Sequence, residues 1–330
     1  MANLRVDDLD KKLINLVQSE FPLTKDPYAT LGRQLAISEH EVILRIDRLK
    51  AMAIIRLMGP VLDTRSLGYQ STLVAMSVTK DKLDEAERII AEHPRVSHGY
   101  ERNHRFNLWF TLATPIGADI ETELTELTSP IVAEAVFSLP ATRVFKIGAY
   151  FDMGENGQGV AGTPTSAEDS FPKKVELSPK DKLIIRKLQQ DLPLVPTPFT
   201  AMAEQSGISV EDFLAHCQSL LKRGIMRRFG ASINHNNAGY KANAMTCWIV
   251  PSDMVDVAGR ELARLQQVSH CYERRTNPLW HYNLFAMIHG RSRGICQEVV
   301  TDISHKIGLA DYVLLYSTKE FKKTRINYLV

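Results

Sequence analysis

The sequence predicts an α+β protein built as a tandem duplication, in which each half is a winged helix-turn-helix followed by a ferredoxin-like (βαββαβ) domain. Two observations predict this fold class. The same short sequence signatures recur in the same order in the two halves of the 330-residue chain. In each half, a stretch with helical spacing of apolar residues precedes a stretch in which strand and helix patterns alternate.

The repeat covers nearly the whole chain. Matching pairs are Asp10-Lys11 with Asp181-Lys182, Ile37-Ser38 with Ile208-Ser209, Gly68-Tyr69 with Gly239-Tyr240, and Thr142 to Phe145 with Thr318 to Phe321. A Gly-, Ser- and Pro-rich segment without apolar periodicity separates the copies and is typical of a flexible linker. We therefore predict helix-turn-helix domains at 1–66 and 176–237, ferredoxin-like domains at 67–152 and 238–330, and a linker at 153–175. Each half is expected to bury its own core.

The first domain of each half has three predicted helices and a wing. In the first copy, helices are expected at 7–20, at 30–36 and from Ser38 onward. Ser38 is a typical N-cap, and Glu41 three residues later predicts a capping box. Two short apolar runs, 54–57 and 61–62, lie on either side of Gly59-Pro60 and predict a small hairpin, the wing.

The second domain of each half alternates strand and helix. In the first copy the apolar patterns predict strands at 69–79, 96–102 and 106–114, helices at 82–92 and 119–127, and one or two final strands within 132–150. This order is βαββαβ, and the second copy repeats it from Tyr240 to Asn327.

Composition sets broad limits on function. The net charge of +2 shows no overall bias toward nucleic acid or membrane. The N-terminus lacks the apolar core of a signal peptide and no apolar run is long enough to span a bilayer, so we expect a cytoplasmic protein. All four cysteines lie in the second half without C-x-x-C spacing, which indicates reduced packing residues and neither a zinc site nor a disulfide frame.

One element is repeated with unusual polarity. The stretch V-S-H-G-Y-E-R begins at Val96, and V-S-H-C-Y-E-R begins at Val268. Each places His, Tyr and Arg at alternate positions, so in a strand the three side chains leave the same face. The two rows are His98, Tyr100 and Arg102 in the first half, and His270, Tyr272 and Arg274 in the second.

The architecture resembles the Lrp/AsnC regulators, on the stretch from Ser38 to Ile55. The H-x-Y-x-R elements, followed by N-L-W-F-T-L or by W-x-Y-N-L-F-x-M-I-H-G, look more closely like the paired subunits of the siroheme decarboxylases. The resemblance implies removal of two acetate carboxyl groups from siroheme, giving 12,18-didecarboxysiroheme on the way to heme d1 or heme. It also implies that the two ferredoxin-like domains pair within the chain; a homo-oligomer is possible too.

The resemblance implies a pocket for an apolar macrocycle with eight carboxylates. Guanidinium groups bind carboxylates bidentately and stay charged, so the arginines are predicted to hold them. Aromatic side chains would wall the ring, although each is also a candidate for ordinary core packing. The predicted substrate-binding residues are Arg102, Arg105, Arg274, Arg275, Asn107, Asn283, Trp109, Trp280 and Tyr282, with Phe106 and Met287 as further wall candidates.

Loss of an acetate carboxyl requires protons at the ring carbon and then at the new methyl group. Histidine exchanges protons near neutral pH, so His98, His104 and His270 are predicted to transfer them, with Tyr100 and Tyr272 as donors or relays. His289 on a later strand is a candidate for a supporting role. No redox cofactor and no resident metal is expected, since siroheme carries its own iron. Alternative roles for the histidines are axial ligation of that iron, or the interface between the halves.

The halves are not equivalent. His104 precedes Asn107-Leu108 where the second half has Trp280, and the second hairpin is longer. We expect one productive pocket, or two with different duties.

The rival functions are DNA-binding regulation and tetrapyrrole sensing. The recognition-like helices open with Glu39 and Glu41, and with Glu211 and Asp212, which would repel phosphate. Arginines that keep DNA binding open are Arg45, Arg48, Arg223, Arg227 and Arg228. DNA binding is therefore an unlikely function on sequence grounds.

Overall fold

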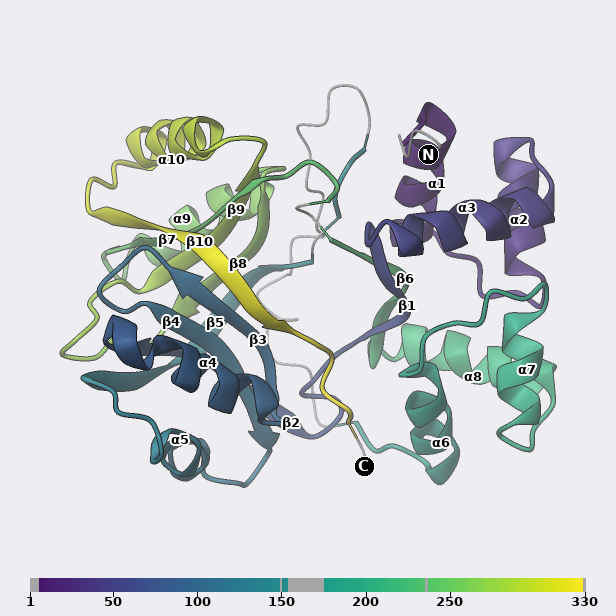
Figure 1. The fold of residues 1–330 in the computed structure, drawn as a ribbon, viewed down its shortest axis with the longest axis horizontal. Coiled ribbons are helices and arrows are strands. Elements are labelled where there is room, and N and C mark those ends of the chain that lie inside the picture. The colour runs from purple at the N-terminus through teal and green to yellow at the C-terminus, as the bar shows by residue number, and fades with distance from the viewer. Residues whose placement is uncertain (1–5, 149, 154–174, 235–236, 329–330) are drawn as a thin grey trace.

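The computed structural model describes residues 6–148, 150–153, 175–234 and 237–328, so most of the predicted linker lies outside the described residues. The chain forms two layers side by side (Figure 1). One layer holds the helix-turn-helix domains of both halves, and the other holds all the strands and helices of the two ferredoxin-like domains. The predicted fold class is confirmed.

The helix-turn-helix layer contains three helices from each half. They are α1 (Asp8–Ser19), α2 (Pro27–Leu35) and α3 (Glu39–Ala51), then α6 (Pro179–Leu188), α7 (Pro198–Glu204) and α8 (Val210–Lys222). Complete capping boxes open α1 and α6. The box predicted for α3 is only half formed. The Ser38 hydroxyl accepts the Glu41 N–H at 3.1 Å, but the Glu41 carboxylate instead accepts a hydrogen bond from Arg45.

The predicted wing hairpin is wrong. Residues Ile55–Leu62 form one strand, β1, which pairs antiparallel with its counterpart β6 (Met226–Ile233) from the other half. Gly59 does not turn the chain: it lies opposite Gly230, where a Cβ would overlap the Val17 carbonyl of α1. Pro60 is tolerated because a strand of a two-stranded sheet has one edge without a partner.

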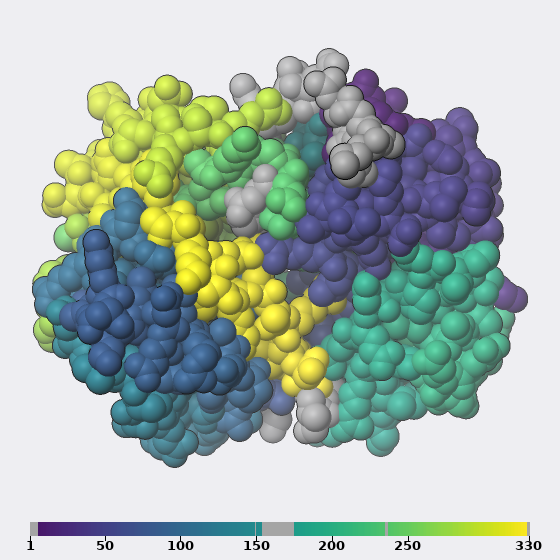
Figure 2. Space-filling view, viewed as in Figure 1, coloured from purple at the N-terminus to yellow at the C-terminus, as the bar shows by residue number. Residues whose placement is uncertain are grey.

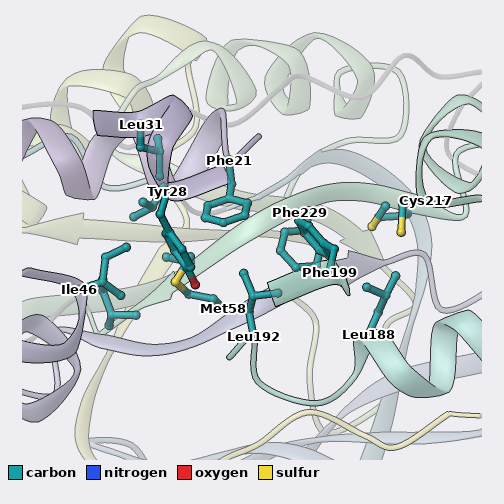
Figure 3. Packing of buried hydrophobic residues seen from close by; sticks show 14 of the residues in the cluster. Phe21, Tyr28, Leu31, Ile46, Met58, Leu188, Leu192, Phe199, Cys217 and Phe229 are labelled. Carbon is teal, nitrogen blue, oxygen red and sulfur yellow. The ribbon is translucent and has the colours of Figure 1, made fainter. Parts of the chain in front are cut away.

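The pairing of β1 with β6 merges the two helix-turn-helix domains into one core (Figure 3). Phe21 of the first half packs 5.6 Å from Phe229 and 6.4 Å from Phe199, measured between ring centroids. The buried Tyr28 donates its hydroxyl hydrogen to the Pro193 carbonyl at 3.0 Å. The expectation that each half buries its own core is therefore wrong in this layer, because an apolar surface of each domain is covered by the other.

The ferredoxin-like domains have the predicted βαββαβ order. The first contains β2 (Tyr69–Ser77), α4 (Leu83–Glu92), β3 (Val96–Arg102), β4 (Leu108–Pro115), α5 (Ile120–Thr128) and a single final strand, β5 (Ala135–Ile147). The second contains β7 (Ala242–Trp248), α9 (Val255–Arg264), β8 (Val268–Arg274), β9 (Leu284–Gly290), α10 (Arg293–Ile307) and β10 (Tyr312–Lys323).

The two four-stranded sheets close into one barrel in the order β10-β3-β4-β2-β5-β8-β9-β7. The halves meet where β10 pairs with β3 and where β5 pairs with β8, which confirms the predicted pairing within the chain. Figure 1 shows β10 crossing to lie beside the first half, and Figure 2 shows its surface between that half and the helix-turn-helix layer. Helices cover the outside of the sheets, so inward-facing side chains meet in a shared interior.

The structure confirms the prediction for the cysteines: all four are unpaired and buried. In the described ranges, no helix is long and apolar enough to cross a membrane.

Candidate functional site

Both His-Tyr-Arg rows point into the barrel. Gly99 lies between His98 and Tyr100, and a Cβ on Gly99 would overlap the ring of Phe321. Phe321 packs against the core between the sheet and the helices of the first half, so Gly99 faces the helices. Cys271 lies on the helix-facing side of β8, with its Sγ 3.8 Å from the Gly259 carbonyl of α9. Side chains at the alternate positions therefore face inward. Barrel closure brings together two rows that lie far apart in the sequence.

His98 and His270 lie at the same end of the barrel. Burial lowers the pKa of each imidazole to about 4. The positive charge of Lys323 lowers the pKa of both further, and His98 also opposes protonation of His270. In each half the preceding serine is the imidazole's hydrogen-bond partner at Nδ1, Ser97 at 2.9 Å and Ser269 at 2.8 Å. Both rings are neutral near pH 7 while the interior holds no added negative charge.

The tyrosines occupy the middle of each row. Burial raises the pKa of Tyr100 and of Tyr272, so both keep their hydroxyl hydrogen and can donate it. The guanidinium of Arg102 lies 5.3 Å from the centre of the Tyr100 ring, and that of Arg274 lies 4.8 Å from the Tyr272 ring. These cation–π contacts hold each arginine beside its own tyrosine.

Arg102 and Arg274 are charged groups inside the barrel with no carboxylate partner in the described part of the chain. Each donates to a backbone carbonyl at 2.8 Å, Arg102 to Leu315 and Arg274 to Leu139. The Nε of each is buried without a hydrogen-bond acceptor among the described residues. Burial lowers the pKa of both to about 10, so both remain charged near pH 7. An unpaired buried cation is costly, and an anionic ligand would remove that cost.

The histidine end of the barrel opens toward the helix-turn-helix layer. Arg56 of β1 forms a 2.6 Å ion pair with Glu320 of β10, and Glu320 lies opposite Tyr100 across the strands. A cavity of about 380 Å³ at this end is lined by Tyr100, Lys241, Asn243, Ser317, Thr318, Lys319 and Glu320. Arg56 and its repeat partner Arg227 are close enough to act electrostatically on Tyr100 and Tyr272 respectively. We call this end of the barrel, with the cavity and the Arg56–Glu320 ion pair, the mouth. It is lined mainly by cationic and hydroxyl side chains.

Aromatic side chains fill the opposite end. The Trp280 ring contacts Trp109 at 5.1 Å, Tyr282 at 5.1 Å and Phe106 at 5.9 Å. His104 belongs to this cluster: its ring lies 5.5 Å from Trp280, and its Nδ1 accepts the Phe106 N–H at 3.1 Å. The predicted wall residues are therefore neighbours. His104, however, follows Arg102 beyond the end of β3 and is separated from His98 by the length of the strand.

Four predicted binding residues do not reach the interior. The Asn107 side-chain amide donates to the Val78 carbonyl at 2.8 Å and accepts the Val78 N–H at 3.1 Å. The Asn283 amide makes the same two hydrogen bonds with Val250, both at 2.8 Å. These asparagines tie the strand ends to the adjoining loops. Arg105 and Arg275 are exposed on the outside.

Sequence reasoning missed Arg56 near the mouth, although the repeat held a signal for it; Lys146 and Lys322 on the final strands were candidates for contact with substrate propionates, with a solvated position as the alternative. Arg56 and Arg227 occupy matching positions on β1 and β6, and of the two only Arg227 is a sequence-based candidate, for DNA contact. Lys146 and Lys322 also match. They donate to the Leu265 and His93 carbonyls at the ends of α9 and α4, at 2.8 and 2.6 Å, and so cap these helices.

The arginines that favoured DNA binding are engaged within the protein. Arg45 pairs with Asp7 and Asp10 at 2.8 Å and with Glu41 at 2.7 Å, and Arg48 also pairs with Asp10. In the second half, Arg223 pairs with Asp181 at 2.9 Å, Arg227 pairs with Asp63, and Arg228 donates to the Gln18 carbonyl. Phosphate contacts would have to compete with these bonds, and DNA binding stays a function that the sequence predicts to be unlikely.

The two buried histidines predict acid sensitivity of the ligand-free protein. Their pKa values of about 4 lie below the unfolded value near 6.5, so between these pH values the unfolded chain takes up protons that the folded chain refuses. The contribution of these two histidines to the free energy of unfolding should therefore be fully present above pH 6.5 and be lost as the pH drops toward 4. We expect the double variant His98→Gln/His270→Gln to show a shallower fall in thermal midpoint across this window. Parallel curves for the two proteins would contradict the assignment.

Comparison with known proteins gives a consistent result. The sequence model of the AsnC-like ligand binding domain matches residues 66–146 and 237–322, and that of the siroheme decarboxylase NirDL-like HTH domain matches 10–56 and 181–227. The siroheme decarboxylase of Hydrogenobacter thermophilus is 36% identical over 318 residues, covering 96% of this chain and 94% of that protein. The siroheme decarboxylase NirDL subunit of Paracoccus denitrificans is 32% identical, covering 97% of each.

A solved structure extends the likeness to three dimensions. The crystal structure of the siroheme decarboxylase NirDL in complex with an iron-uroporphyrin III analogue superposes with a TM-score of 0.71 at 34% identity, covering 98% of this chain and 95% of that chain. Full-length similarity at this level, with the helix-turn-helix and ligand-binding models each matched twice, shows the family: the chain belongs to the siroheme decarboxylases.

Proposed function

We propose that this chain is a siroheme decarboxylase, a lyase that removes the carboxyl groups of the C12 and C18 acetates of siroheme to give 12,18-didecarboxysiroheme. The observation that carries the proposal is the pair of guanidiniums of Arg102 and Arg274, which lie inside the barrel without carboxylate partners in the described structure, on the same two rows as two neutral histidines. A ligand rich in carboxylates would pair with the two guanidiniums and would also favour protonation of the two histidines. Relatives over the whole chain length are named for this activity.

The reaction needs protons in a defined order. A proton delivered to the pyrrole carbon next to the one that bears the acetate makes the ring an electron sink, and the bond to the carboxylate then breaks with release of carbon dioxide. The bonding electrons form an exocyclic methylene, which takes up a proton to become the methyl group as the ring carbon returns its own. Each carboxylate lost thus consumes one proton. His98 and His270 are imidazoles at the mouth that can exchange protons once a bound carboxylate offsets the burial that lowers their pKa to about 4.

The remaining interior groups bind and orient the substrate. Arg102 and Arg274 donate to substrate carboxylates, and Tyr100 and Tyr272 add neutral donors. A bound carboxylate also raises the pKa of a nearby imidazole, so substrate binding would charge the histidines that are neutral in the free protein. Burial weakens the hydration of the reacting carboxylate, which favours loss of neutral carbon dioxide. The chemistry requires no further cofactor, since the iron enters with the substrate.

Anaerobic incubation with siroheme tests the proposal. We expect mass spectrometry to show the successive loss of two carboxyl groups, with carbon dioxide released in equal amount. Siroheme that binds but keeps its mass would replace the enzyme by a tetrapyrrole sensor. A salt-dependent shift of promoter DNA without turnover would favour a regulator.

A further inference from the structure

The second half carries a buried polar chain behind its histidine. The Ser269 hydroxyl is 2.8 Å from Nδ1 of His270 and 2.7 Å from Nε2 of His289. His289 in turn bonds through Nδ1 to the amide oxygen of Asn243, its cross-strand neighbour. Ser269, His289 and Asn243 are all buried, at 0, 6 and 8% exposure. Asn243, which lines the cavity at the mouth, is thus linked through His289 and Ser269 to His270.

The direction of these hydrogen bonds follows from the amide oxygen. That oxygen can only accept, so Nδ1 of His289 carries a hydrogen and Nε2 of the neutral ring is an acceptor. Ser269 therefore donates its hydroxyl hydrogen to Nε2 of His289 and accepts the Nδ1–H of His270. The hydrogen-bonded series thus fixes neutral His270 as the Nδ1–H tautomer, with a lone pair on Nε2.

The first half lacks this chain. Counted from the Asn-Leu pair that opens each strand, Ala113 of β4 stands where β9 has His289. Its cross-strand neighbour is Ser71, where His289 faces Asn243. His98 keeps the contact with Ser97 at 2.9 Å, but among the described residues no second imidazole hydrogen-bonds to that serine. The two histidine rows match in sequence and differ in what supports them.

We propose that Ser269, His289 and Asn243 form a proton relay that serves His270, making the second half the proton-donating side of the site. The inference rests on the proposed decarboxylase function. When a proton is added to Nε2 of His270, the Nδ1 hydrogen of His270 passes to Ser269 and the Ser269 hydrogen passes to Nε2 of His289, so the positive charge moves to His289. When Nε2 of His270 then gives its proton to the substrate, both hydrogens return and the resting tautomer is restored. The proton count balances: one proton enters at Nε2 of His270 and one leaves from the same atom. His289 and Ser269 are positioning residues that act through His270.

The surroundings of His270 explain why a relay is needed. Lys323, Arg274, Lys146 and His98 all act against a second proton on His270. The relay lets the extra proton reside on His289, whose ring contacts the Phe151 ring at 5.2 Å as well as Asn243 and Ser269. Because each carboxylate lost consumes a proton, the donor must be recharged twice per siroheme.

The test compares Ser269→Ala and His289→Gln with two serine controls in the full-length protein. With saturating siroheme, we expect Ser269→Ala and His289→Gln to slow carboxyl loss about 10- to 100-fold, within the range of proton-transfer effects, with KM changed less than about twofold. Ser304→Ala removes another buried hydroxyl, the acceptor of the Trp248 N–H at 2.8 Å outside the barrel interior, and should keep the wild-type rate. Ser97→Ala should cost about threefold at most. The relay variants should also shift the acid limb of the pH–rate profile.

A second measurement does not depend on turnover. Nitrogen-15 NMR of labelled histidine should show His270 protonated at Nδ1 in the free wild-type protein, and a change in tautomer ratio in Ser269→Ala. If wild type turns over but Ser269→Ala and His289→Gln match Ser97→Ala in rate, or the His270 tautomer does not change, the relay is overturned. If wild type itself releases no carbon dioxide, the proposed function fails while the NMR result still tests the hydrogen-bond chain.

Discussion

Replacing His270 by Ala is expected to lower the rate of carboxyl loss from siroheme about 100- to 10,000-fold, the usual cost of removing a general acid. The imidazole lies inside the barrel near His98, and burial keeps its pKa at about 4 until an anionic ligand arrives. Alanine removes the donor without disturbing the guanidinium of Arg274 on the same row. Binding of siroheme, followed by the change in its absorption spectrum, should therefore be retained while single-turnover decarboxylation measured by mass spectrometry is lost.

His104→Ala is the matched control for this variant. Both residues were predicted from the sequence to transfer protons, but His104 lies in the aromatic cluster with Trp280 and Phe106. Its removal should leave the rate within about tenfold of wild type, below the usual range for a general acid. A wild-type rate for His270→Ala, or an equally severe loss for His104→Ala, would reverse the assignment of the catalytic end of the barrel.

The inward orientation of the rows was predictable because it depends only on local geometry. A strand alternates its faces, and Gly99 and Cys271 mark the helix-facing side in the two copies. The repeat likewise predicted a second row of the same three residue types in the other half. Local spacing and duplication together were enough to predict that Tyr100 and Arg102 share one face of their strand, and that Tyr272 and Arg274 do so in the second half.

Long-range pairing was not predictable. Gly59-Pro60 has the composition of a turn, and only the approach of α1 to Gly230 across the shared core shows why glycine is needed on these strands. The Asn residues in each N-L pair looked like ligands, but their amides bond to nearby backbone. Side chains in loops past a strand end have no fixed face, so the spacing of His104 from His98 carried no information on distance.

Replacing Arg102 by Met is expected to stabilise the free protein and weaken siroheme binding at the same time. Arg102 is 4% exposed, its Nε has no acceptor in the described structure, and its guanidinium donates only to neutral oxygens, those of Leu315 and Ser317, with Met287 Sδ nearby. Replacing even a buried ion pair by apolar side chains of similar volume gains up to about 1–4 kcal/mol in other proteins, and Arg102 has no ion-pair attraction to lose among the described residues. The thermal midpoint of the ligand-free variant should therefore rise.

The same change removes a charge-assisted hydrogen bond to a substrate carboxylate, which is worth about 1.5–3 kcal/mol, or roughly a 10- to 150-fold loss of affinity. Arg274→Met should behave alike, because the second guanidinium also bonds only to a carbonyl, that of Leu139. Arg105→Met is the control, since this exposed arginine stacks on the Phe106 ring outside the pocket. A lower midpoint together with unchanged affinity for Arg102→Met and Arg274→Met would mean that these cations hold the barrel together. A higher midpoint with weaker binding identifies them as groups kept at a cost in stability for an anionic substrate.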